Sequence, residues 1–119
     1  MGSMMSSVED INLDDTTYRI LSYNVEWGFL KVPDDINTDS CGHPIPHTDL
    51  AQQTHLTLIS KNIGLMYPDI CFLQEMGSLD AVNYIGNKLK SMFNLDYSCY
   101  YSNGDSTGNQ GVGLLIKSN

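Results

Sequence analysis

Short apolar runs alternate with segments of helical periodicity along this chain. Tyr18–Val25 is rich in aromatic, β-branched and aliphatic residues, a composition typical of a strand. The four apolar residues Ile70–Leu73 lie between a Pro-Asp break and two polar residues, which predicts a strand buried on both faces. Two more strands are predicted at Tyr97–Tyr101 and Val112–Lys117, joined by a glycine-rich turn.

Two helices are predicted between these strands. The first begins at the capping pair Thr48-Asp49 and ends before Pro68, because proline disfavours helical geometry at the residue that precedes it. The second begins at the cap residue Ser78. Apolar residues recur at helical spacing in both: Leu56, Ile59, Ile63 and Met66, widened by Leu58 and Leu65, in the first, and Leu79, Val82, Ile85, Leu89, Met92 and Phe93 in the second.

The predicted order is therefore β-α-β-α-β-β, an α/β fold in one domain that covers residues 18–119. The first strand, the helix and Ile70–Leu73 are expected to form a right-handed βαβ unit, whose two strands are parallel and adjacent or nearly so. The carboxyl ends of parallel strands meet at one edge of a sheet, where ligands gather in such folds. We expect Asn24, Glu26 and Glu75, which follow the two strands, to converge there.

Glu75 stands at the end of an apolar strand, where a lone charge is costly. It is therefore either a paired or metal-bound site residue or a solvated residue beyond the strand. Carboxylate and amide oxygens are hard ligands that suit magnesium or manganese. Magnesium takes one or two protein carboxylates and keeps waters that a phosphate can displace. The pattern is thus compatible with phosphate chemistry.

The net charge of −8 is concentrated in the first part of the chain. Residues 1–50 hold nine acidic side chains against two basic ones, and residues 51–119 hold five against four. Nucleic-acid-binding proteins usually carry a basic patch, and none is visible here. A polyanionic substrate would therefore need a bound cation or another chain to supply the attraction.

Residues 31–48 form a predicted long loop that contains Cys41, His43 and His47. A zinc site needs four ligands, usually with a second close pair, so a plain surface loop is the favoured interpretation. The three cysteines form no CxxC pair, which is typical of reduced thiols in an intracellular protein, cytoplasmic or nuclear, with Cys71 a small core residue. His55 is interpreted as a partly exposed histidine without a role.

Residues 1–17 are interpreted as a tag followed by a flexible acidic lead-in. No apolar run is long enough to predict a membrane span, and no secretory signal is visible.

Three short motifs carry a resemblance: ILSYNVEWG at Ile20–Gly28, PDICFLQE at Pro68–Glu75 and GVGLL at Gly111–Leu115. Together and in this order they resemble the endonuclease/exonuclease/phosphatase (DNase I-like) superfamily, most closely its apurinic/apyrimidinic endonucleases. The resemblance implies that Glu75 ligates magnesium, and that Asn24 orients the metal site and contacts phosphate. Glu26 falls where the endonuclease branch usually has aspartate, which implies a longer reach to a metal-bound water.

The family's Asp-x-Asn pair and late Asp-His pair, which prepare the attacking water, have no counterpart in this sequence. The resemblance therefore implies the N-terminal half of a four-layer α/β/β/α sandwich, incomplete without a second half. It implies part of a magnesium-dependent phosphodiesterase of the nuclease kind, whose partners are nucleic acid and the C-terminal half of the same fold. This chain alone is expected to be inactive. Two alternatives stay open: a lipid or inositol phosphate phosphodiesterase or phosphatase, and an inert truncated interaction module.

Overall fold

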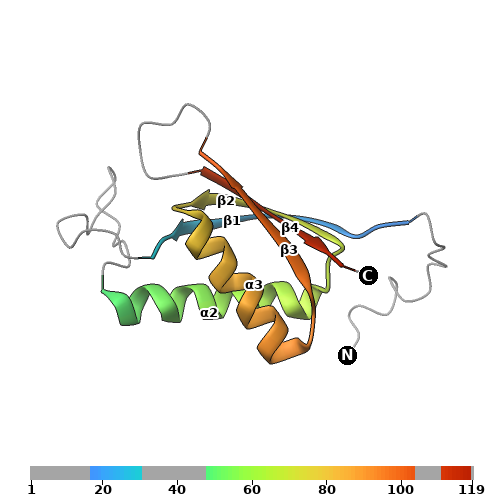
Figure 1. Ribbon diagram of the computed structural model, residues 1–119, viewed down its shortest axis with the longest axis horizontal. Coiled ribbons are helices and arrows are strands. Elements are labelled where there is room, and N and C mark those ends of the chain that lie inside the picture. The colour runs from blue at the N-terminus through green and yellow to red at the C-terminus, as the bar shows by residue number, and fades with distance from the viewer. Residues whose placement is uncertain (1–16, 31–47, 104–110, 119) are drawn as a thin grey trace.

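The described residues of the protein form a four-stranded mixed sheet with two helices on one face (Figure 1). The structure is a computed structural model that describes residues 17–30, 48–103 and 111–118. The elements are β1 (Ile20–Gly28), α2 (Asp49–Met66), β2 (Ile70–Met76), α3 (Leu79–Phe93), β3 (Tyr97–Ser102) and β4 (Gly111–Lys117). This order confirms the predicted β-α-β-α-β-β arrangement and the α/β class. The expectations for residues 1–16 and 31–47, and for the turn at 104–110, lie outside the described residues.

Local sequence signals set the ends of both helices. The hydroxyl groups of Thr48 and Ser78 each accept a hydrogen bond from the backbone N–H three residues further on, both at 3.1 Å. These contacts satisfy backbone donors that the first helical turn leaves free. Tyr67 ends α2 in the left-handed region, with φ 53°, directly before Pro68, and Asn94 ends α3 in the same way, with φ 57°. The predicted starts of both helices and the predicted end of α2 are therefore confirmed.

The sheet has the strand order β1-β2-β4-β3. β1 and β2 are parallel neighbours, paired from Ile20↔Ile70 to Asn24↔Gln74, as the predicted crossover requires. β4 lies antiparallel to both β2 and β3. β1 and β2 therefore run in the same direction and end at the same edge of the sheet.

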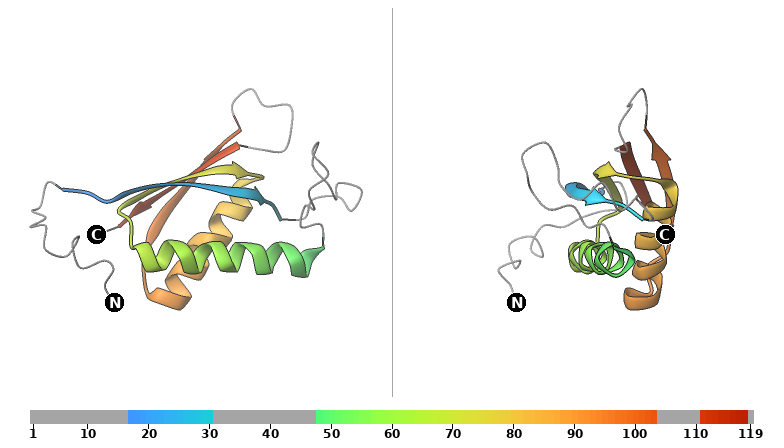
Figure 2. Two further views of the ribbon diagram at one scale, coloured as in Figure 1. Left: turned by 180° about the vertical axis from the view of Figure 1, so that it is seen from behind. Right: turned by 90° about the vertical axis from the view of Figure 1, so that its left-hand side faces the viewer.

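The core lies between the sheet and the two helices, which occupy the same side of it in both views (Figure 2). α2 packs against β1 and α3, and α3 packs against β3 and β4. The fully buried core side chains include Leu56, Ile63, Cys71, Leu73, Met76, Val82, Ile85, Leu89 and Leu115. Burial raises the pKa of the Cys71 thiol to about 12, so Cys71 is a core residue and not a thiolate at neutral pH.

The other face of the sheet is not covered by any described residue, which corrects the expectation of a strand buried on both faces. Phe72, in the middle of β2, is 39% exposed, whereas its neighbours Cys71 and Leu73 are 0% exposed. We call this side the open face. By register and alternation it comprises Ile20, Ser22, Asn24, Ile70, Phe72, Gln74, Ser98, Tyr100, Ser102, Val112, Leu114 and Ile116. None of these residues is charged.

Several predicted core positions of the helices are also exposed. Leu58 and Leu65 are 57% and 77% exposed, so they do not widen the buried stripe of α2, and Met66 at its end is 54% exposed. In α3, Leu79 and Met92 are 46% and 38% exposed. Each helix touches the sheet along one narrow side only, so an apolar residue beside the stripe stays in solvent.

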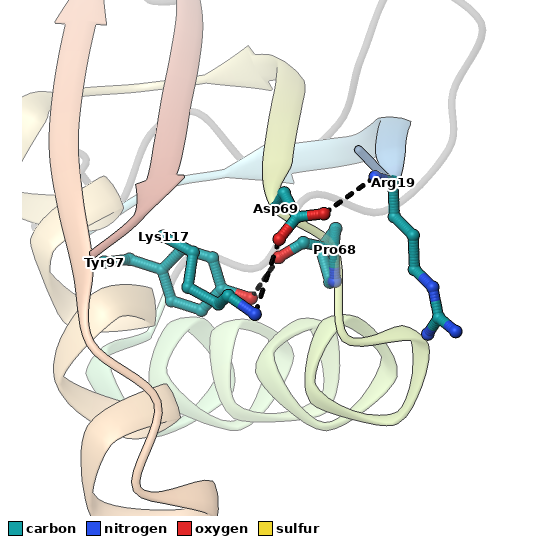
Figure 3. Close-up of polar contacts among 5 residues, drawn as sticks. All are labelled: Arg19, Pro68, Asp69, Tyr97 and Lys117. Atoms are coloured by element: carbon teal, nitrogen blue, oxygen red, sulfur yellow. Dashed lines mark hydrogen bonds and ion pairs between the residues drawn. The ribbon is translucent and has the colours of Figure 1, made fainter. Parts of the chain in front are cut away.

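Polar contacts join the four strands at the end of the sheet where β1 and β2 begin and β4 ends (Figure 3). The Asp69 carboxylate accepts a hydrogen bond from the backbone N–H of Arg19 at 2.8 Å and lies 3.4 Å from the Lys117 ammonium. The Tyr97 hydroxyl donates to the carbonyl of Pro68 at 2.6 Å. The Arg19 backbone N–H, with Lys117 beside it, holds the pKa of Asp69 below its ordinary value of 3.8.

Because the folded state lowers the pKa of Asp69, its carboxylate stabilises the fold above about pH 3.8, and this contribution is lost as the pH falls through the folded-state pKa. We expect Asp69→Asn to lower the free energy of unfolding at pH 7 by about 1 kcal/mol. The deficit is expected to shrink as the pH falls below 3.8, because the wild-type carboxylate is then protonated first in the unfolded chain and, at lower pH, in the folded chain. Urea unfolding of both proteins between pH 7 and pH 3 measures this, and a deficit that stays constant across the range contradicts it.

Candidate functional site

Asn24 and Glu75 meet at the shared carboxyl end of β1 and β2. The Nδ2 group of Asn24 donates a hydrogen bond to Oε2 of Glu75 at 2.9 Å. The two residues are 51 positions apart in the chain and are brought together by the parallel pairing that ends at Asn24↔Gln74. The predicted convergence of an amide and a carboxylate at this edge is confirmed.

A bulge in both strands makes this contact possible. Regular pairing of β1 with β2 breaks between Asn24 and Gly28, and the pairing of β2 with β4 breaks between Gln74 and Met76. The backbone of Glu75 has φ 63°, in the left-handed region that residues other than glycine rarely adopt. Strict alternation would turn Glu75 toward the helices. The bulge shifts the alternation by one residue, so Met76 enters the core and Glu75 meets Asn24.

The orientation of the Asn24 amide is determined by its neighbours. Its Oδ1 atom accepts a hydrogen bond from the backbone N–H of Glu26 at 3.0 Å. Because a backbone N–H only donates, the oxygen must face Glu26 and the nitrogen must face Glu75. Asn24 therefore orients the Glu75 carboxylate. A contact of Asn24 itself with a metal or a phosphate stays a prediction.

The donor set at this edge suits a hard cation. Glu75 is half-buried, and within residues 17–30, 48–103 and 111–118 no hydrogen bond or ion pair engages its second oxygen, Oε1. Magnesium commonly binds one or two carboxylate oxygens of a protein and keeps several water ligands. The Oε1 atom of Glu75 fits the role of such a carboxylate ligand. Glu26 is exposed, and its carboxylate makes no hydrogen bond or ion pair to the described residues, so only its backbone takes part here.

The residues after the bulge hold the two strand ends together. The N–H of Gly77 donates to the carbonyl of Gly28 at 2.8 Å, beyond the last regular pair. A Cβ atom on Gly77 would lie 2.3 Å from the ring of Phe29, which is itself buried and packs edge-on against Trp27 at 5.3 Å between centroids. Glycine is required at position 77 because the Phe29 ring occupies the place of a side chain.

His55 is partly exposed, as the sequence analysis expected, and it makes a contact that the sequence did not reveal. Its Nε2 atom lies 2.8 Å from the carbonyl oxygen of Val25 and 2.9 Å from that of Glu26. The contact spans 29 to 30 positions and depends on how α2 packs beside β1. No motif or residue spacing in the sequence predicts this contact.

The described residues hold no group of three or more His, Cys, Asp or Glu side chains arranged to bind a metal. Cys41, His43 and His47, weighed as zinc ligands above, lie outside the part of the chain that the structure describes. No helix in the described ranges has both the length and the apolar content that crossing a bilayer requires.

Several known structures resemble this chain in fold, and this chain matches only a part of each of those longer proteins. No family model and no curated protein matches the sequence. The structure is similar to truncated Caenorhabditis elegans TDP2, with 22% identity and a TM-score of 0.48, over 84% of this chain and 29% of that one. It is also similar to ANGEL2, a 2',3'-cyclic phosphatase, in complex with adenosine-2',3'-vanadate, with 18% identity and a TM-score of 0.48, over 84% and 27% of the two chains.

A third similar structure is a functionally unknown conserved protein from Enterococcus faecalis V583, with 17% identity and a TM-score of 0.41, over 82% of this chain and 31% of that one. The chain therefore spans less than a third of the length of these three proteins. The expected closeness to the apurinic/apyrimidinic endonucleases has no support from these likenesses.

Proposed function

We propose that this chain is one part of a magnesium-dependent phosphodiesterase of the DNase I-like superfamily, with Glu75 as its metal ligand. The observation that carries the proposal is the 2.9 Å contact between Asn24 and Glu75 at the carboxyl end of two parallel strands. Ligands gather at such strand ends in α/β sheets. The left-handed backbone at Glu75 adds support, because strain of this kind concentrates at functional sites.

Each residue has a distinct task in this proposal. Glu75 holds magnesium or manganese through the oxygen that Asn24 leaves free, and Asn24 keeps the carboxylate in that orientation. Glu26 has a reach long enough for a metal-bound water. The bound cation would neutralise charge on a phosphoryl group and on its leaving oxygen. It would also offset the repulsion between a polyanionic substrate and a chain with a net charge of −8.

The remaining chemistry requires a partner, which we propose to be the C-terminal half of the same fold, on a second chain or a cleaved remainder. Its sheet would pack on the open face, since sheets stack through apolar side chains about 10 Å apart. The open face suits such a partner because it is uncharged and contains a hollow of about 240 Å³ beside Phe72, Tyr100 and Leu114. Water activation would come from that half.

We propose nucleic acid as the substrate, because the motif around Asn24 resembles the nuclease branch of the superfamily. No feature of the described residues favours a lipid or inositol phosphate instead. The open face argues against an inert self-sufficient module, since such a module would be expected to cover its own apolar surface.

The proposal is tested by mixing this chain with a second polypeptide that supplies the proposed C-terminal half, and assaying cleavage of labelled DNA and RNA. We expect cleavage that requires both polypeptides and Mg²⁺ and is abolished by EDTA. Each polypeptide assayed alone is the control, and we expect both to be inactive.

Failure of the reassembled protein to cut either nucleic acid would count against a nuclease. Release of phosphate from an inositol phosphate under the same conditions would favour the alternative, a lipid or inositol phosphate phosphodiesterase or phosphatase. Folding of the mixed proteins, followed by circular dichroism, keeps these outcomes distinct from a failure to assemble.

A further inference from the structure

The helix α2 contacts the kinked end of β1 through the imidazole of His55. The Nε2 atom lies within hydrogen-bond distance of two carbonyl oxygens, 2.8 Å from Val25 and 2.9 Å from Glu26. Carbonyl oxygens only accept, so Nε2 must carry a proton and donate to both. The side chain is half-buried between the helix and the strand, where a fixed donor is worth more than in water.

The backbone that His55 contacts is the strained part of the strand. Glu26 and Trp27 have φ of 51° and 65°, and neither is glycine. Residues in this region cost about 1 kcal/mol or more each and persist only where their surroundings hold them. The donated hydrogen bonds from His55 fall on the carbonyls of Val25 and Glu26, at the start of this segment.

The same kink sets the position of the proposed metal ligand. The N–H of Glu26 donates to Oδ1 of Asn24 at 3.0 Å, and Nδ2 of Asn24 donates to Oε2 of Glu75 at 2.9 Å. A continuous series of hydrogen bonds thus runs from His55 on α2, through the backbone of Glu26 and the amide of Asn24, to the carboxylate of Glu75. We infer that His55 is a positioning residue, which holds the β1 kink so that Asn24 presents the Glu75 carboxylate to a cation.

The inference rests on the proposed function only in its last step, the effect on a bound cation. The earlier steps concern the Asn24 amide and can be observed without metal. If His55 served stability alone, its loss would lower the unfolding free energy and leave the Asn24–Glu75 contact unchanged in the folded molecules.

The first test uses the unaltered chain and the ¹⁵N chemical shifts of the imidazole. We expect a proton on Nε2 of His55. A neutral ring with its proton on Nδ1 would overturn the inference, because Nε2 would then face two carbonyl lone pairs. This measurement needs no substitution and stands even where a variant does not fold.

The second test compares His55→Leu with His55→Gln, whose amide nitrogen reaches about where Nε2 lies. The readouts are the side-chain NH₂ resonances of Asn24 in the metal-free protein and the affinity for Mn²⁺ alone. For His55→Leu we expect shifted, averaged Asn24 resonances and Mn²⁺ affinity about tenfold weaker, the usual cost of losing a group behind a metal ligand. For His55→Gln we expect both to stay close to wild type.

Unchanged Asn24 resonances in folded His55→Leu would overturn the inference, whatever the metal affinity. So would equal losses in both variants, because a hydrogen-bond donor at position 55 would then be irrelevant. Glu75→Gln, measured alongside, separates the two proposals. If it leaves Mn²⁺ affinity unchanged, the metal site proposal fails, while the Asn24 resonances still decide the role of His55.

Discussion

Replacement of Glu75 by glutamine is expected to abolish the magnesium-dependent activity of the reassembled protein while the fold stays nearly intact. Glutamine keeps the shape of the side chain and can still accept the hydrogen bond from Asn24. It lacks the charge that a hard cation requires. Losing about 3 kcal/mol of electrostatic stabilisation corresponds to roughly a 100-fold loss of rate, and we expect at least that.

The matched control is Asp96→Asn, which makes the same change of charge at an exposed carboxylate that pairs with Lys90 at 3.1 Å. Cleavage assays and Mn²⁺ titrations of both variants, with urea unfolding to verify the fold, decide the matter. We expect Asp96→Asn to be active. Activity retained by Glu75→Gln would remove Glu75 from the site. Asn24→Ala is expected to lose less, because Asn24 acts through the orientation of Glu75.

The parts of the fold that the sequence predicts correctly depend on local chemistry. Thr48 and Ser78 cap helices because a hydroxyl at that position satisfies backbone N–H groups wherever the helix packs. Pro68 ends α2 for an equally local reason. That Asn24 and Glu75 share one edge of the sheet needs only one further rule, the parallel pairing of two strands that a helical crossover connects.

What covers each face of the sheet is not encoded in a local pattern. The apolar residues Ile70–Leu73 predict burial on both sides, and the structure buries only the side toward the helices, leaving Phe72 exposed. An apolar run indicates that a surface is suited to burial, but it does not indicate which element covers that surface. We attribute this difference to the proposed second half, whose sheet would occupy the open face.

The fine geometry of the site is also beyond sequence patterns. Left-handed backbone is usually signalled by glycine or asparagine, yet here it falls on Glu26, Trp27 and Glu75. His55 reaches the kink from a helix about 30 positions away, through packing that depends on the whole core. A sequence can suggest that two groups share an edge, but the bulge that turns them toward each other depends on tertiary contacts.

Leu73→Ala is expected to destabilise the chain by about 3 kcal/mol, whereas Phe72→Ala, one residue away, is expected to cost about 1 kcal/mol. Leu73 is 0% exposed within the core between sheet and helices, so its removal leaves a cavity. Phe72 points from the open face and is 39% exposed, so solvent can fill the space that it leaves. Leu73→Ala removes fewer atoms than Phe72→Ala, but it should therefore lower the free energy of unfolding more.

Urea unfolding of the two variants beside the wild-type chain measures this difference. A domain of this size has a small margin of stability, so Leu73→Ala is also expected to be partly unfolded without denaturant. Equal costs at the two positions would mean that Phe72 is covered in solution, by a second copy of the chain, and sedimentation would then show a dimer.

Adding the proposed second half should reverse the order of the two effects. Phe72 would then lie between two sheets, and its truncation would act on association, where a buried aromatic side chain commonly contributes 2 kcal/mol or more, about a 30-fold change in affinity. Leu73 contacts only its own core, so Leu73→Ala would act through folding of this chain alone. If Phe72→Ala leaves the affinity for the second half unchanged, the second sheet docks elsewhere. The proposal that this sheet packs on the open face would then be wrong.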